Sequence, residues 1–246
     1  ISLGGKWTQM EAFELGYIAL CIFARSLSWY EMYQPATWKY FEEVQTVVPC
    51  HLAHIRPLTF FTCSGHYLSC LYILWETLFG VSPPAEFAGL VWGVLFGITI
   101  GFWIFVYDPR DYRPLEERRK EANDALFLTY QGLWLTDWLN HGPLLLLFSK
   151  IAYEAGPEAF LVSNCWMPTA WGVTWLGGIW LPFQILGGDP LYADLRSDKP
   201  ITHRASVIIK MIAITTAGYI AGMALVTPCY ELFLAGAARV GFSGEL

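Results

Sequence analysis

The side chains best suited to acid–base chemistry lie together in one segment, Thr136–Pro143, which reads TDWLNHGP. Asp137 and His141 are four residues apart, so on a helix they share one face. A carboxylate beside an imidazole fixes the tautomer of the ring and increases its basicity, as a general base requires. The alternative is a structural set of hydrogen bonds between helices that also includes Asn140. The spacing leaves both interpretations open.

The other histidines and the cysteines do not form a recognisable metal motif. The chain has five histidines, too few for the histidine boxes of membrane di-iron enzymes, and His51 and His54 are expected near a membrane interface. A haem held by two histidines stays open, although no pair stands out. The six cysteines include no C-x-x-C pair, so we expect neither a metal site nor a disulfide framework.

These candidate residues belong to a very apolar chain. Of the 246 residues, 55% are hydrophobic and only 15% are charged, whereas a soluble domain has about 25% charged residues. The net charge of −6 excludes a protein that binds nucleic acid by neutralising its phosphates. The apolar residues come in long runs, and about 20 of them in a row suffice for a helix to cross a membrane. The sequence therefore predicts an all-α, polytopic membrane protein.

Six segments approach the length of a membrane span, and each is expected to be a helix because backbone groups in lipid must be satisfied internally. They are Ala12–Tyr30, Leu58–Phe79, Phe87–Tyr107, a stretch within Leu126–Tyr153, Phe160–Leu186 and Val207–Leu232. The first is the weakest because it contains Glu14 and Arg25, and the fifth is interrupted by Pro168 and Pro182. An ionisable residue in a span is a functional candidate by default, but Arg25 is expected to extend to the interface instead. We expect residues 1–246 to form a single transmembrane domain.

The basic residues predict the orientation of these spans. Six spans place both termini on one side of the membrane and the first, third and fifth loops on the other. By the positive-inside rule, those three loops face the cytosol or matrix. The most charged of them is a loop at about 108–125, expected to be solvated or to dock a partner. The basic residues of the three loops are Lys39, Arg56, Arg110, Arg113, Arg118, Arg119, Lys120, Arg196, Lys199 and Arg204.

A repeated G-x-x-x-G pattern marks one face of the third predicted span. Its members are Gly89, Gly93, Gly97 and Gly101. Small residues at this spacing let a second helix or a lipid approach the backbone closely. This face is our candidate contact surface for a neighbouring subunit, and packing within the same chain is an equally good interpretation.

Three motifs occur in an order found in a known family. They are RPLTFF at Arg56–Phe61, GFWIFVYDPR at Gly101–Arg110 and WLNH at Trp138–His141, followed by GGDPLYADL at Gly187–Leu195. From Ile55 to Leu195 the chain resembles the androgen-induced protein family, which includes the androgen-dependent regulator of tissue factor pathway inhibitor. The resemblance implies a six-helix membrane fold. For some members it also implies hydrolysis of fatty acid esters of hydroxy fatty acids by a threonine nucleophile and a histidine.

The resemblance implies which residue is the nucleophile, but one of the two histidines of the family's motif is missing from this chain. The family's threonine matches Thr59, and the first histidine of its H-x-x-H-T motif matches His141. The second histidine, which is the family's catalytic one, is replaced by Leu144, and a leucine cannot accept a proton. A hydrolase would therefore use Thr59 as nucleophile, His141 as base and Asp137 to orient it, with backbone amides binding the oxyanion.

The replaced histidine favours a non-catalytic function. Our first hypothesis is an integral-membrane accessory subunit of a larger complex, recruited from this hydrolase family. We expect a respiratory or ATP synthase complex of the mitochondrial inner membrane, because the chain begins at Ile1 and a removed presequence would fit. The alternative is an intramembrane lipid esterase of the endoplasmic reticulum or plasma membrane. In either case we expect bound phospholipids and no other cofactor, and membrane lipids, with other membrane-protein subunits in the first case, as partners.

Overall fold

The computed structural model describes residues 12–32, 60–107, 117, 135–186, 195 and 199–239. Within these ranges the regular structure is helical and contains no strand, which confirms the all-α prediction for this part of the chain. The longer helices are α1 (Ala12–Met32), α4 (Phe61–Phe79), α5 (Ala85–Gly101), α8 (Pro143–Glu154), α9 (Met167–Trp175) and α11 (Ile201–Arg239). The shorter ones are η4 (Phe102–Val106), α7 (Leu135–Asn140), η5 (Pro157–Phe160), η6 (Val162–Asn164), η7 (Leu176–Trp180) and α10 (Leu181–Ile185).

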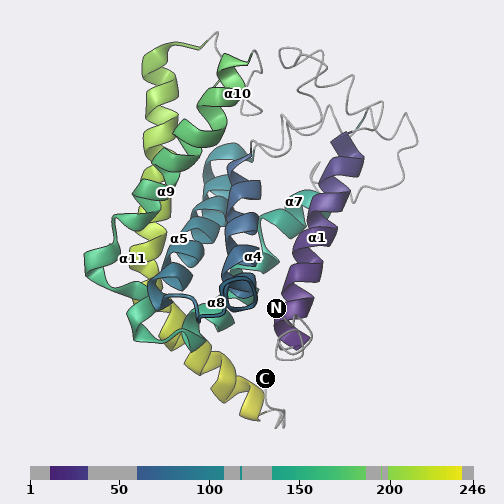
Figure 1. Cartoon of the computed structure of the whole chain (residues 1–246), viewed down its shortest axis with the longest axis vertical. Coiled ribbons are helices and arrows are strands. Elements are labelled where there is room, and N and C mark those ends of the chain that lie inside the picture. Colours follow the sequence, from purple (N-terminus) through teal and green to yellow (C-terminus); the bar gives the residue numbers. More distant parts are fainter. Residues whose placement is uncertain are drawn as a thin grey trace.

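Helix α5 lies at the centre of the bundle (Figure 1). It packs against α11 on one side and against α4 and α8 on the others, while α9 lies beside α11. Helix α1 flanks the opposite side of the bundle, where it contacts α4, α7 and α8. Helix α1 begins and α11 ends at the lower end of Figure 1, and the colours show that consecutive helical segments run alternately up and down. The core at their centre is apolar and aromatic, with Tyr17, Val91, Leu95, Phe148 and Tyr219 almost fully buried.

Glycine and proline set several of the helix boundaries. Helix α4 ends at Gly80, whose φ of 74° lies in the left-handed region that favours glycine. Pro143 begins α8, and Pro168 lies in the first turn of α9, where the missing N–H of a proline leaves no helical hydrogen bond unmade. Pro182 lies in α10, directly after the π-helical turn η7. The fifth predicted segment is therefore interrupted before Pro168, whereas the helical backbone continues from α9 through η7 into α10 past Pro182.

The described helices overlap the six segments predicted from the sequence, but only part of the six-span prediction is confirmed. Two of them, Ala85–Phe105 and Ile201–Val226, are long and apolar enough to cross a membrane. Helices α1 and α4 have the length but include polar residues such as Glu14, Arg25 and Glu76. In the fourth segment α8 has only 12 residues, too few for a span. In the fifth segment the 9 residues of α9 continue without a break through η7 into α10. The strongly charged segment predicted at about 108–125 lies outside the described residues apart from Glu117.

The glycine face of α5 packs within the chain. An added Cβ at Gly93 would lie 3.1 Å from both the backbone nitrogen and the Cβ of Tyr219 on α11, and one at Gly97 would lie 3.0 Å from the Cα of Thr215. Gly89 faces the backbone of Ala159 in η5, and Gly101 faces Ile214 in ordinary contact. Glycines with this spacing let two backbones approach closely. Of the two interpretations that the sequence leaves open, packing within the same chain is therefore the one that these contacts support, because α11 and η5 cover this face.

We predict that Gly93→Val destabilises the fold, because the new side chain would meet backbone atoms that cannot rotate away. Overpacking of this kind costs about 1–3 kcal/mol. Gly16→Val in α1 is the matched control, since nothing lies within 4 Å of a Cβ added there. When the thermal unfolding of both variants is measured in detergent, the midpoint temperature of Gly93→Val should be well below that of Gly16→Val. Equal midpoints would contradict close α5–α11 packing.

Candidate functional site

Polar side chains from three helices meet inside the bundle. They come from the last turns of α1, the first turns of α4 and the end of α7, and α1 contacts both other helices. On α4, three of them share one helical face because they are three or four residues apart. We call this group the polar cluster; it consists of Arg25, Ser28, Thr62, Cys63, His66, Asn140 and His141.

Arg25 points into the bundle rather than toward an interface. Its Nη2 donates to Oδ1 of Asn140 and its Nη1 to Sγ of Cys63. Nδ2 of Asn140 in turn donates to Oγ of Ser28 at 3.3 Å. The expectation that Arg25 extends to the membrane surface is therefore wrong. Among the described residues only neutral acceptors bind its guanidinium, and its buried Nε has no hydrogen-bond partner there.

The hydrogen bonds of His141 define its tautomer. Nδ1 lies 2.9 Å from the backbone oxygen of Asp137, and because a carbonyl only accepts, Nδ1 carries the proton. Nε2 of the neutral ring is then an acceptor, and Oγ1 of Thr62 lies 3.3 Å from it. The ring of Phe102 stacks on the imidazole with 3.7 Å between centroids, and Nε1 of Trp103 donates to the backbone oxygen of His141 at 2.9 Å. The cluster therefore holds the imidazole in one orientation.

This arrangement is that of a hydroxyl beside a general base. A hydroxyl that donates to a neutral imidazole is the pairing found at activated nucleophiles. The imidazole is only 8% exposed and Phe102 covers one of its faces. His66 lies on the same side of α4 as Thr62 and is 1% exposed, with no hydrogen-bond partner for either ring nitrogen among the described residues. The cluster is therefore polar but closely packed.

The residues predicted for the site are only partly brought together. His141 lies in the cluster, whereas Thr59 lies outside the described residues, as do His51 and His54. Asp137 orients His141 through its backbone carbonyl, so the prediction that its carboxylate holds Nδ1 is wrong. Leu144, at the position of the family's catalytic histidine, is 1% exposed in the apolar core. No group of three or more potential metal ligands occurs within the part of the chain that the structure describes.

Sequence analysis missed Thr62 and the inward direction of Arg25. Thr62 follows Thr59 by three residues, and this helical spacing was the available signal for a second hydroxyl near the same face. Nothing in the sequence pairs Arg25 with Asn140, because 115 positions separate them. Such a contact depends on how α1 and α7 cross and is visible only in the folded chain.

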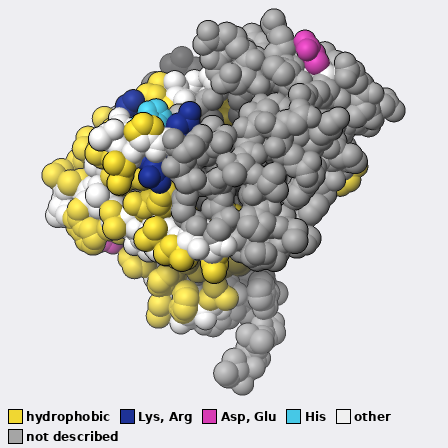
Figure 2. All heavy atoms as spheres, turned by 90° about the horizontal axis from the view of Figure 1, so that it is seen from above, with side chains coloured by type: hydrophobic (Ala, Val, Ile, Leu, Met, Phe, Trp, Pro, Cys, Tyr) yellow, Lys and Arg dark blue, Asp and Glu magenta, His cyan; other side chains and the backbone are white. Residues whose placement is uncertain are grey.

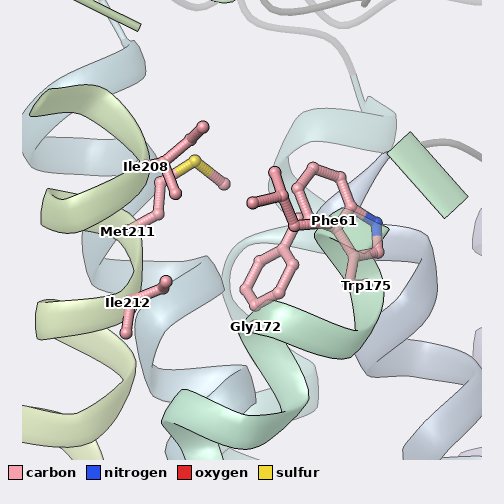
Figure 3. A pocket seen from close by; sticks show the side chains of 7 residues that line it. Phe61, Gly172, Trp175, Ile208, Met211 and Ile212 are labelled. Atoms are coloured by element: carbon pink, nitrogen blue, oxygen red, sulfur yellow. The ribbon is translucent and has the colours of Figure 1, made fainter. Parts of the chain in front are cut away.

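The two cavities described for the fold lie away from the polar cluster. One has a volume of about 10 Å³ and is apolar; Phe61 and Trp175 lie on one side of it and Ile208, Met211 and Ile212 of α11 on the other (Figure 3). That volume is about the minimum for one water molecule. The other is an open groove of about 460 Å³ at the turn between α4 and α5, lined by residues that include Trp75, Glu86 and Asn164. Neither reaches Thr62 or His141.

Comparison with known proteins adds no identification. No protein-family model, curated protein or solved structure matches the chain. The resemblance to the androgen-induced protein family therefore stays a prediction from the three motifs. The function has to be inferred from the fold, the polar cluster and the surface.

We predict that Asn140→Leu destabilises the protein more than Ser28→Ala. Asn140→Leu removes an acceptor from a charged guanidinium, a hydrogen bond worth about 1.5–3 kcal/mol. Ser28→Ala removes a bond between neutral groups at 3.3 Å, which contributes about 1 kcal/mol or less. Thermal unfolding of the two variants in the same detergent compares these losses. A smaller effect for Asn140→Leu would contradict the inward position of Arg25.

Proposed function

We propose that this chain is an integral-membrane protein with six membrane-crossing segments and acts as a non-catalytic accessory subunit of a larger membrane complex. The six segments are α1, α4, α5 with η4, α7 with α8, α9 to α10, and α11. Their alternating directions, with the start of α1 and the end of α11 at one end of the bundle, support this arrangement. Two of the segments meet the length and composition of a span by themselves.

The observation that carries the proposal is the uncovered apolar surface of α11. In the most apolar window of its span only 22% of the residues are buried, compared with 56% for α5. Large side chains such as Ile209 and Ile220 are 66% and 53% exposed. Exposing this much apolar surface to water is unfavourable by about 25 cal/mol per Å². Lipid or another protein must therefore cover this helix.

The length of α11 favours a protein neighbour in addition to lipid. Its 39 residues extend for about 58 Å at 1.5 Å per residue. The hydrocarbon core of a membrane is only about 30 Å thick, so a large part of α11 continues outside it. In Figure 1 the lower part of this helix projects past the rest of the bundle, where other subunits can pack against it.

The polar cluster supports a non-catalytic function. Leu144 is a buried core residue, so the position of the family's catalytic base contributes packing and no proton acceptor. The imidazole of His141 is covered by Phe102, and the described cavities lie elsewhere. The mitochondrial inner membrane, with a respiratory or ATP synthase complex as host, stays a prediction.

We predict that the chain co-migrates with a complex much larger than its own 27.8 kDa. Native membranes, including a mitochondrial fraction, would be extracted with several mild detergents, separated on native gels and identified by mass spectrometry along each lane. Migration only at the size of a monomer or small oligomer in every detergent would overturn the subunit proposal. The fraction that contains the large complex identifies the host membrane.

A second candidate function is favoured by the contact between Thr62 and His141. In an intramembrane lipid esterase acting on fatty acid esters of hydroxy fatty acids, Oγ1 of Thr62 would attack the ester carbonyl while Nε2 of His141 takes its proton. His141 would return that proton to the leaving hydroxyl group, and water would then hydrolyse the acyl-threonine. This version uses Thr62 in place of Thr59.

The two candidates predict different behaviour for a variant at Thr62. If the chain is a subunit, purified protein does not hydrolyse lipid esters and is not labelled by an acyl-directed covalent probe, so Thr62→Val changes neither result. If it is an esterase, Thr62→Val abolishes both turnover and labelling. Thr174→Val is the control, because Thr174 is an exposed threonine on α9 whose hydroxyl donates to the backbone oxygen of Ala170 in the same helix. Labelling of the wild type that is lost in Thr62→Val alone would favour the esterase.

A further inference from the structure

One side of α11 combines a positively charged end with an apolar strip. Along its first six turns, exposed residues recur with helical periodicity, so they lie on one side of the helix. We call this surface the α11 stripe. Its polar members come first along the chain and its apolar members follow, except that Ile209 precedes Lys210. The members of the stripe are Thr202, His203, Ser206, Ile209, Lys210, Ala213, Ala217, Ile220 and Ala224.

Positive charge gathers at the beginning of the stripe: Asp198 directly precedes Lys199 in the chain, but no acidic residue follows until after Tyr230. Lys199 precedes the helix and Arg204 lies at the edge of the stripe. Lys199 and Lys210 are exposed and form no ion pair with another described residue, and the buried Nε of Arg204 has no hydrogen-bond partner among them. Seen from above, basic side chains and a histidine gather here among apolar ones (Figure 2). The N–H groups of the first helical turn add partial positive charge.

The remainder of the stripe has the length and shape of a lipid tail site. From Lys210 to Ala224 the helix rises about 21 Å, which exceeds the ~15 Å of hydrocarbon in one leaflet. The small side chains of Ala213 and Ala217 form a shallow depression on the helix surface, and the larger Ile209 and Ile220 lie at its border. An extended acyl chain can therefore lie along the stripe while its headgroup stays at the charged end.

We propose that the α11 stripe binds one anionic phospholipid. The phosphate is held by Lys210 and Lys199 with the hydroxyl groups of Thr202 and Ser206 as donors, and one acyl chain lies along the apolar part of the stripe. The charged end is the end at which the sequence places the basic loops, and the leaflet on that side contains the anionic lipids. A choline headgroup would bring its own cation against these lysines, so zwitterionic lipid fits less well. This inference rests on the membrane insertion in the proposed function.

Binding of two lipids with the same tails tests the headgroup. The full chain in detergent micelles would be titrated with dioleoyl phosphatidylglycerol or dioleoyl phosphatidylcholine, and bound lipid counted by native mass spectrometry. We expect phosphatidylglycerol to bind preferentially. Lys210→Gln should weaken it about fivefold, which corresponds to about 1 kcal/mol for one basic residue near an anionic surface. Lys210→Arg should retain binding, because it keeps the positive charge. Lys199→Gln, which removes a charge just before the helix, should also weaken phosphatidylglycerol binding.

A pair of tryptophan variants tests the tail. Ala217→Trp fills the middle of the stripe and should reduce phosphatidylglycerol binding without a change of charge. Met223→Trp is the control, because Met223 is exposed on a different side of α11. Equal binding of the two lipids, no effect of either lysine substitution, or equal effects of the two tryptophans would each overturn the site.

Extraction of vesicles with alkaline carbonate separates failure of this inference from failure of the proposed function. If the chain stays in the membrane pellet but shows no preference for phosphatidylglycerol, the lipid site is wrong and membrane insertion stands. If the chain is released into the supernatant, both are wrong. Preferential binding that Lys210→Gln weakens, with the chain retained in the pellet, supports the site.

Discussion

The close approach of α5 and α11 is the contact on which the rest of the fold depends. Backbone atoms of α11 lie 3.0–3.2 Å from the position of a Cβ added at Gly93 or Gly97, so a larger side chain there would force the helices apart. With α11 on one side, the other sides of α5 are left for α4 and α8. The end of α5 continues into η4, which supplies Phe102 and Trp103 to His141. One glycine-based contact therefore fixes both the uncovered face of α11 and the surroundings of the polar cluster.

The polar cluster shows how an arginine is accommodated inside an apolar bundle without a carboxylate among the described residues. Arg25 uses the side-chain oxygen of Asn140 and the sulfur of Cys63 as acceptors. In a low-dielectric interior an unpaired charge is very costly, whereas hydrogen bonds to neutral dipoles offset part of that cost. The same need explains why Asn140 and His141 have partners on four different elements, α1, α4, α7 and η4. A network of this kind ties α1 to α4 and α7 whether or not it performs chemistry.

The fold was easier to predict from the sequence than the site. Long apolar runs and the position of Pro168 located the helical segments, because these features act over a few neighbouring residues. The site depends on contacts between residues far apart in the chain, such as Thr62 with His141 and Arg25 with Asn140. The spacing of Asp137 and His141 was informative, yet the group that binds the ring is a backbone carbonyl, which no side-chain motif encodes. The glycine pattern predicted close packing correctly but did not say that the partner is in the same chain.

The two polar regions of this protein point to different environments. The cluster at Arg25 lies within the bundle, where side chains and backbone groups of the same chain supply acceptors for most of its donors, and it has no described cavity beside it. The α11 stripe lies on the outside, where Lys210 has no acidic partner in the described part of the chain and an apolar strip follows it. A charge whose hydrogen bonds are made inside the bundle stabilises the fold. A charge without an opposite charge beside an exposed apolar surface favours the binding of another molecule there. By this distinction the external surface of α11, more than the internal Thr62–His141 pair, is the surface at which we propose that the protein meets its partners.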